Sequence, residues 1–119
     1  MELADAQREI ETISRAYGRL FDVERTDDWL VLKLNEEVGE LTQAFLTRSG
    51  RTRHRGLTPE QSDEAVRDEL ADVLAHVLVL AERLGVDLDD ALERKWFRYR
   101  HLVTDEDRAG QDRVPERRA

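Results

Sequence analysis

The stretch that begins at Thr58 and ends at Gly85 constrains the fold of this chain most, because both of its ends carry helix signals. Thr58 is a good N-cap, Pro59 suits the first helical position, and Gln61 completes a capping box. Gly85 supplies the left-handed residue that commonly follows a helix. Val73–Ala81 is uncharged, and a helix that is apolar nearly all round is buried. The sequence therefore predicts a long, largely buried helix here.

Apolar periodicity and caps predict three more helices, spanning Ala4 to about Glu24, Asp27 or Asp28 to about Arg48, and Asp87 to about Leu102. We expect the first helix to bend or break at Gly18. The connection around Gly85 is short, so the third and fourth helices should pack antiparallel. No strand pattern, repeat or glycine-rich phosphate loop is present, and the predicted fold class is all-α, a four-helix bundle. Residues 1–103 would form the domain and residues 104–119 a charged, disordered tail.

Composition narrows the function classes. The formal net charge of −8 argues against general binding to nucleic acid or to acidic membranes. The longest uncharged run is far too short to cross a bilayer, and the absence of cysteine favours a cytoplasmic protein. The uncharged run Val73–Ala81 of the third helix suggests that another subunit covers part of its surface, which predicts a homodimer or homotetramer.

Two groups of acids border the apolar faces of the second and third predicted helices. Glu36, Glu37 and Glu40 share one sector of the second helix, since a helix turns about 100° per residue. Glu69 and Asp72 lie three residues apart on one edge of the third. Carboxylates that converge at the edge of a core repel one another unless a cation lies between them. Two facing helices with this spacing predict a divalent-metal site, because hard oxygen ligands suit Mg²⁺.

The two acid motifs also resemble the signature of a known family. Glu36-Glu37-Val38-Gly39-Glu40-Leu41, a linker, and Glu69-Leu70-Ala71-Asp72-Val73-Leu74 resemble the all-α nucleoside-triphosphate pyrophosphatase superfamily, which includes the MazG-like proteins. The resemblance covers roughly residues 10 to 96. It implies a Mg²⁺-dependent enzyme, in which Mn²⁺ would substitute, that hydrolyses non-standard or surplus (d)NTPs to monophosphate and pyrophosphate. The alternatives are a phosphoribosyl-ATP pyrophosphohydrolase and a non-catalytic helical interaction module.

The resemblance assigns roles to individual residues. The implied Mg²⁺ ligands are Glu37, Glu40, Glu69 and Asp72. Glu36 would be either a ligand of a second metal or the base that activates water, and its position on the open side of the cluster favours the base. Lys95 matches a family lysine that contacts phosphate. The asparagine and arginine that usually follow are replaced by Tyr99 and Leu102, and Arg98 or Arg100 would take over their role.

Four further features have two readings each. Trp29 would stack on a base or pack at a core or subunit contact, and Lys33 would bind phosphate and neutralise the acids or extend along the surface. His76 is a polar core residue or a metal ligand, although Mg²⁺ prefers oxygen. The basic linker Arg51–Arg55 would either bind phosphates or form a solvated loop.

Overall fold

The computed structural model describes residues 1–52 and 55–111, and every regular element within them is helical. The elements are α1 (Leu3–Leu20), α2 (Asp27–Arg48), α3 (Pro59–Leu84), α4 (Leu88–Lys95), the 3₁₀ helix η1 (Phe97–Leu102) and α5 (Asp105–Gln111). The predicted all-α fold class is therefore confirmed. No helix in these ranges is long and apolar enough to cross a membrane.

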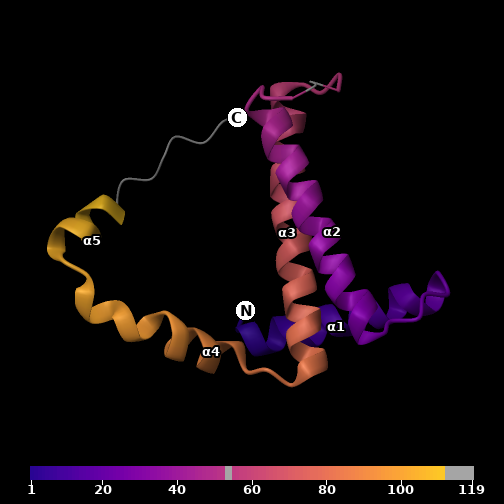
Figure 1. The fold of residues 1–119 in the computed structure, drawn as a ribbon, viewed down its shortest axis with the longest axis horizontal. Helices are drawn as coiled ribbons and strands as arrows, with labels where there is room; N and C mark the ends of the chain where they lie inside the picture. Colours follow the sequence, from indigo (N-terminus) through magenta and orange to yellow (C-terminus); the bar gives the residue numbers. More distant parts are fainter. Residues whose placement is uncertain (53–54, 112–119) are drawn as a thin grey trace.

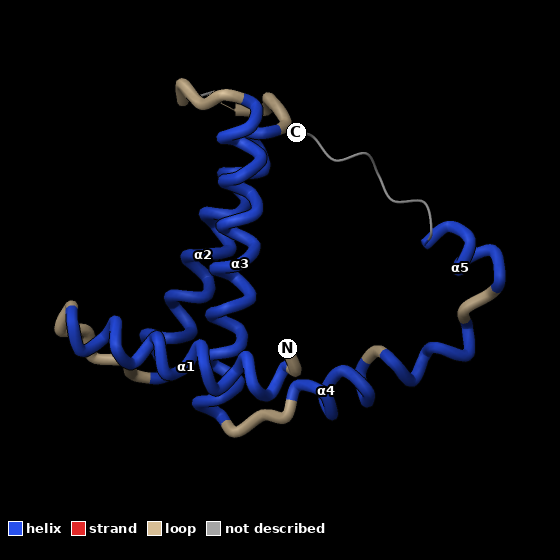
Figure 2. Tube along the Cα trace, turned by 180° about the vertical axis from the view of Figure 1, so that it is seen from behind, coloured by secondary structure: helices blue, strands red, loops and turns tan. Residues whose placement is uncertain are grey.

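Helices α2 and α3 form an antiparallel pair, and α1 crosses the pair near the start of α2 and the end of α3 (Figures 1 and 2). The predicted ends of α3 are confirmed. The Thr58 hydroxyl accepts a hydrogen bond from the Gln61 amide at 3.1 Å, and the Gln61 side chain accepts one from the Thr58 amide at 2.9 Å. Gly85 ends the helix at a left-handed φ of 67°. Among the described residues the buried apolar ones are Leu30, Leu78, Val79 and Ala81, so the core lies where α1 crosses the pair.

The end of α1 differs from the prediction. The helix continues through Gly18 without a break and ends at Leu20, because Asp22 has a left-handed φ of 52°. Gly18 serves close packing instead, since a Cβ there would lie 2.7 Å from the side chain of Arg25. Arg25 donates two hydrogen bonds to the buried carboxylate of Glu11 at 2.8 and 2.9 Å, which fastens the α1–α2 connection onto α1.

Helix α2 begins at Asp27 and ends at Arg48, as predicted. Its N-cap is Thr26, whose side chain accepts a hydrogen bond from the amide of Trp29 at 3.1 Å. Asp27 pairs with Arg83 on α3 at 2.8 Å. This ion pair joins the start of α2 to the end of α3.

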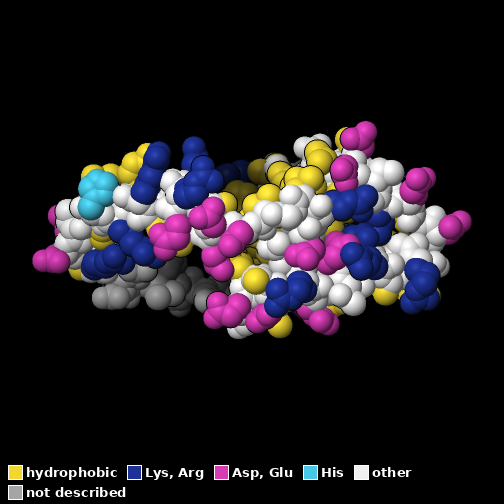
Figure 3. Space-filling model, turned by 90° about the horizontal axis from the view of Figure 1, so that it is seen from below, with side chains coloured by type: hydrophobic (Ala, Val, Ile, Leu, Met, Phe, Trp, Pro, Cys, Tyr) yellow, Lys and Arg dark blue, Asp and Glu magenta, His cyan; other side chains and the backbone are white. Residues whose placement is uncertain are grey.

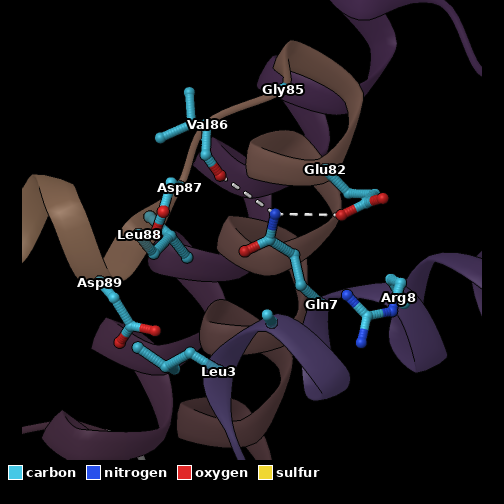
Figure 4. Close-up of a pocket in the computed structure, with 10 residues that line it drawn as sticks. Leu3, Gln7, Arg8, Glu82, Gly85, Val86, Asp87, Leu88 and Asp89 are labelled. Atoms are coloured by element: carbon cyan, nitrogen blue, oxygen red, sulfur yellow. Dashed lines mark hydrogen bonds between the residues drawn. The ribbon is translucent and has the colours of Figure 1, made fainter.

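The predicted antiparallel packing of the third and fourth helices is wrong. Helix α4 contacts α1 and leads away from the α2–α3 pair (Figure 1). Gln7, which is buried in α1, donates hydrogen bonds to the Val86 carbonyl at 3.2 Å and to Glu82 at 3.1 Å (Figure 4). These bonds hold the α3–α4 connection against α1. The predicted fourth helix also breaks at Trp96, with η1 in place of its last part.

The C-terminal segment is partly helical. Helix α5 occupies residues 105–111, where the sequence predicted disorder, whereas residues 112–119 lie outside the described part. The domain boundary at residue 103 stays a prediction.

Many apolar side chains remain uncovered in a single chain. Leu32, Leu70, Leu74 and Trp96 are more than half exposed, at 67%, 53%, 53% and 68%. Hydrophobic side chains lie open among charged ones in Figure 3, where the molecule is seen from below. The radius of gyration, 17.6 Å, exceeds the value of about 13.5 Å expected for a compact domain of this length. One chain alone therefore forms an open arrangement.

Candidate metal centre

Three carboxylates converge between α2 and α3. Glu37 and Glu40 lie one turn apart on α2, and Glu69 projects from α3. One oxygen from each residue lies within 4.8 Å of the other two. The antiparallel packing of the two helices brings these acids together, although 29 to 32 residues separate them in sequence. We call these three residues the acid triad.

Two oxygens of the acid triad are buried without a partner. Glu37 is only 7% exposed, and neither Glu37 Oε2 nor Glu69 Oε2 has a hydrogen-bond partner among the described residues. A buried polar atom without a partner costs about 1–3 kcal/mol, and more when it is charged. A divalent cation bound by these oxygens would remove that cost, and three hard oxygens suit Mg²⁺. The donor set therefore fits the implied metal.

The pKa shifts within the acid triad also favour a bound cation. Burial raises the pKa of Glu37 above its usual value, and the negative charge of Glu40 raises it further. Burial also raises the pKa of Glu69, with the charges of Glu40 and Asp72 adding to the effect. The triad thus favours bound protons or a bound cation over three free negative charges.

Asp72 and Glu36 stand at the edge of this centre. Asp72 is exposed one turn beyond Glu69 on α3, close enough for its charge to raise the pKa of both Glu37 and Glu69. Glu36 accepts a hydrogen bond from Lys33 Nζ at 3.3 Å, and its side chain is 54% exposed. The structure thus brings three of the four predicted ligands into one cluster, with Asp72 and Glu36 beside it.

Lys33 is the nearest positive charge on α2. Its Nζ lies 3.3 Å from Glu36 Oε2 and 4.0 Å from Glu37 Oε1. Burial opposes its charged form, but the hydrogen bond to Glu36 and the charges of Glu36 and Glu37 prevail and raise the pKa of Lys33. Lys33 therefore stays protonated at neutral pH.

A cavity of about 370 Å³ opens on one side of the acid triad, between α1, α2 and α3. We call it the aromatic cavity. Its wall includes Tyr17, Trp29, Lys33, Glu37, Asp72 and His76. His76 Nδ1 lies 2.8 Å from the backbone carbonyl of Asp72, so this ring nitrogen is engaged within α3. The sequence did not single out Tyr17 as a site residue, because its place in this wall depends on how α1 crosses the pair.

A second cavity, of about 310 Å³, opens at the other end of the acid triad, beneath the α2–α3 connection. We call it the linker cavity. Its wall includes Glu40, Gln43, Thr47, Arg55, Ser62 and Glu69. Arg55 brings the basic linker to this wall, whereas Arg53 and His54 lie outside the described residues. The acid triad contributes to the walls of both cavities.

The remaining predicted substrate contacts lie elsewhere. Lys95 and Arg98 line a shallow pocket on α4 and η1 together with Ala91 and Arg94. Arg98 donates a hydrogen bond to the Tyr99 hydroxyl at 2.6 Å. Because α4 leads away from the α2–α3 pair, a single chain does not bring these two residues to the acid triad.

Comparison with known proteins identifies the family. The model of the MazG-like family matches residues 32–109, which include both acid motifs. The chain belongs to the MazG-like family. It is also 35% identical over 94 residues to dCTP pyrophosphatase 1 of the mouse, an alignment that covers 72% of this chain and 54% of the mouse protein. The chain thus spans about half the length of this relative.

Proposed function

We propose that this protein is a Mg²⁺-dependent nucleoside-triphosphate pyrophosphohydrolase that releases a monophosphate and pyrophosphate. The observation that carries the proposal is the pair of buried, unpartnered oxygens of Glu37 and Glu69 in a triad placed between two cavities. The family membership supports it, as does the similarity to a relative named for the pyrophosphatase reaction on dCTP. We expect non-standard or surplus (d)NTPs as substrates, with cytosine deoxynucleotides among the first to test.

The proposed ligands are Glu37, Glu40 and Glu69, completed by Asp72 from the rim. When bound, Mg²⁺, or Mn²⁺ in its place, would offset phosphate charge and lower the pKa of a bound water. The proposed ligands project from two long helices, so the fold sets the spacing of their side chains before the metal binds.

We assign the general base to Glu36. Its carboxylate is half exposed beside the acid triad, where it can meet a water that packed residues would not reach. Its hydrogen bond joins it to Lys33, which forms part of the wall of the aromatic cavity. Glu36 would take the proton from the attacking water, while Lys33 would bind the phosphate nearest the nucleoside.

The nucleoside fits the aromatic cavity. Trp29 and Tyr17 offer flat apolar faces there, and stacking of a base on an aromatic side chain contributes about 1–3 kcal/mol. The wall also carries His76, whose ring can form a hydrogen bond with the edge of a base. These residues come from three helices, so the cavity depends on the crossing of α1.

We further propose that the active form is a homodimer or homotetramer. The exposed apolar residues on α2 and α3 need a cover, and a second copy presents complementary groups on its α4 and η1. These elements carry exposed Trp96 and Phe97 together with Lys95 and Arg98, which a single chain does not bring to its own acids. In such an assembly Lys95 and Arg98 of one subunit would reach the phosphates bound by another. We expect the enzyme to work in the cytoplasm, without nucleic-acid or membrane partners.

A pyrophosphate-release screen tests the proposal. The full chain is incubated with standard and modified (d)NTPs and with phosphoribosyl-ATP, in Mg²⁺ or in EDTA. We expect Mg²⁺-dependent release from at least one nucleoside triphosphate, with no release by Glu40→Gln. Release from phosphoribosyl-ATP alone, or no release from any compound, would contradict the proposed activity.

A further inference from the structure

The two cavities follow each other along α2. Trp29, Lys33 and Glu37 line the aromatic cavity, and Glu40, Gln43 and Thr47 line the linker cavity. At 1.5 Å per residue, the ten positions from Glu37 to Thr47 span about 15 Å. An elongated ligand lying along α2, with its centre at the acid triad, would therefore place one end in each cavity.

The two walls differ in chemistry. The aromatic cavity offers ring faces, whereas the linker cavity offers Arg55, the amide of Gln43, and the hydroxyls of Thr47 and Ser62. Guanidinium, amide and hydroxyl groups donate hydrogen bonds to phosphate oxygens. Thr47 and Ser62 are only 5% and 4% exposed, so these two positions are fixed by packing between α2 and α3. Ala44, Leu57 and Ala65 complete the wall, and the linker cavity thus places hydrogen-bond donors for phosphate oxygens beside the acid triad.

Arg55 is available for such an anion. It makes no ion pair with a carboxylate within residues 1–52 and 55–111, unlike Arg48, which is bound to Asp63 at 2.7 Å. Its φ of 62° is left-handed, a conformation that costs a non-glycine residue about 1–2 kcal/mol, and Gly56 continues the turn at 73°. This turn carries the chain past the cavity mouth, where Arg55 forms part of the wall.

Glu40 and Glu69 line the same cavity and would repel a phosphate when charged. A divalent cation on the acid triad would reverse that effect, because it neutralises both acids at the inner end of the cavity. Arg55 supplies the positive charge at the outer end. The linker cavity should therefore accept a polyphosphate only when the metal is present.

We propose that the linker cavity is the subsite for the pyrophosphate group of the substrate and that Arg55 is its phosphate-binding residue. This assignment rests on the proposed function and gives the substrate a direction. The nucleoside and its first phosphate lie toward Trp29 and Lys33, and the departing pyrophosphate lies toward Arg55. Hydrolysis then leaves the two products in separate cavities.

Calorimetric titration of the full chain with inorganic pyrophosphate, in the presence and absence of Mg²⁺, tests this subsite. Arg55→Ala should weaken binding of the Mg²⁺ complex at least about tenfold, the usual effect of losing a charge-assisted hydrogen bond. Arg55→Lys should recover part of the affinity, because it restores the charge. Arg51, which stacks over Phe45 at 5.9 Å and does not line the cavity, is the matched control, and Arg51→Ala should bind as wild type.

Trp29→Ala tests the direction in which the substrate lies along α2. It should leave pyrophosphate affinity unchanged. Thermal melting of each variant shows that the fold is retained. Wild-type affinity in Arg55→Ala, an equal loss in Trp29→Ala, or binding that does not require Mg²⁺ would each overturn the subsite. Hydrolysis by wild type together with unchanged affinity in Arg55→Ala removes the subsite alone, whereas absence of hydrolysis with every nucleotide removes the proposed function itself.

Discussion

Replacing Glu69 by glutamine removes one of the three negative charges of the acid triad and keeps its shape. In the metal-free protein, the amide of the new side chain can donate a hydrogen bond to Glu37 or Glu40, whose oxygens lie within 4.8 Å. We therefore expect Glu69→Gln to stabilise the metal-free fold. The same change removes a proposed ligand, so it should abolish stabilisation by Mg²⁺.

The size of the gain follows from the geometry. Two unit charges 4.8 Å apart repel by about 3 kcal/mol at an effective dielectric constant of 20. Exposure of Glu40 and proton uptake by the triad reduce that value, and the unpartnered Glu69 Oε2 adds a cost of about 1–3 kcal/mol. We expect Glu69→Gln to raise the free energy of unfolding of the metal-free protein by about 1–2 kcal/mol at pH 8, which corresponds to about 5 °C in Tm for a chain of this size.

The gain should depend on pH with a definite sign. The folded pKa of Glu69 is raised, so between its unfolded and folded pKa values the folded protein binds more protons than the unfolded chain. The metal-free wild type therefore loses stability as pH rises from about 4.5 through the raised pKa. Below that pH window Glu69 is protonated in both the folded and the unfolded protein, and the stability advantage of Glu69→Gln should vanish.

Thermal melting in EDTA and in excess Mg²⁺ at pH 8, with the EDTA measurement repeated at pH 4, measures both effects. Wild type should gain about 2.7 kcal/mol at a hundredfold excess of Mg²⁺ over its dissociation constant, and Glu69→Gln should gain nothing. Glu64→Gln, an exposed change on the same helix, is the control and should behave as wild type. A metal-free Glu69→Gln protein less stable than wild type at pH 8, or one that Mg²⁺ still stabilises, would refute the reasoning.

Three further predictions follow from the site and the open fold. Glu36→Gln should lower turnover by about 10²–10⁴-fold and leave Mg²⁺ binding intact, as single-turnover hydrolysis beside calorimetry will show; unchanged turnover would return Glu36 to a surface role. Trp29→Ala should raise KM for the nucleotide by about tenfold or more with kcat little changed, and an unaffected KM would exclude stacking in the aromatic cavity. Light scattering should give a dimer or tetramer at micromolar concentration, and Leu74→Glu should dissociate it with loss of activity; a stable, active monomer would contradict the assembly.

Signals confined to a few neighbouring residues predicted local structure correctly. The Thr58 capping box and Gly85 set the limits of α3 because each acts through its own backbone neighbours. The approach of Glu37, Glu40 and Glu69 could also be predicted, since one face of each helix carries both the acids and the apolar stripe.

Features set by distant contacts were missed. The direction of α4 depends on the bond between Gln7 and Val86, which lie 79 residues apart and carry no recognisable pairing signal. The end of α1 depends on Asp22 adopting a positive φ, which spacing does not reveal. For the same reason the sequence did not show that Lys95 would stand away from the acid triad, or that Arg55 would line a cavity beside it.

The most direct test of the central claim is ³¹P NMR of the products formed from dCTP, or from the best substrate of the screen, by the full chain. We predict that Mg²⁺ yields the nucleoside monophosphate and pyrophosphate, with no diphosphate or free phosphate. Neither product should form in EDTA or with Glu69→Gln. Cleavage that yields the diphosphate and inorganic phosphate, or full activity in Glu69→Gln, would contradict the acid triad as the catalytic metal centre.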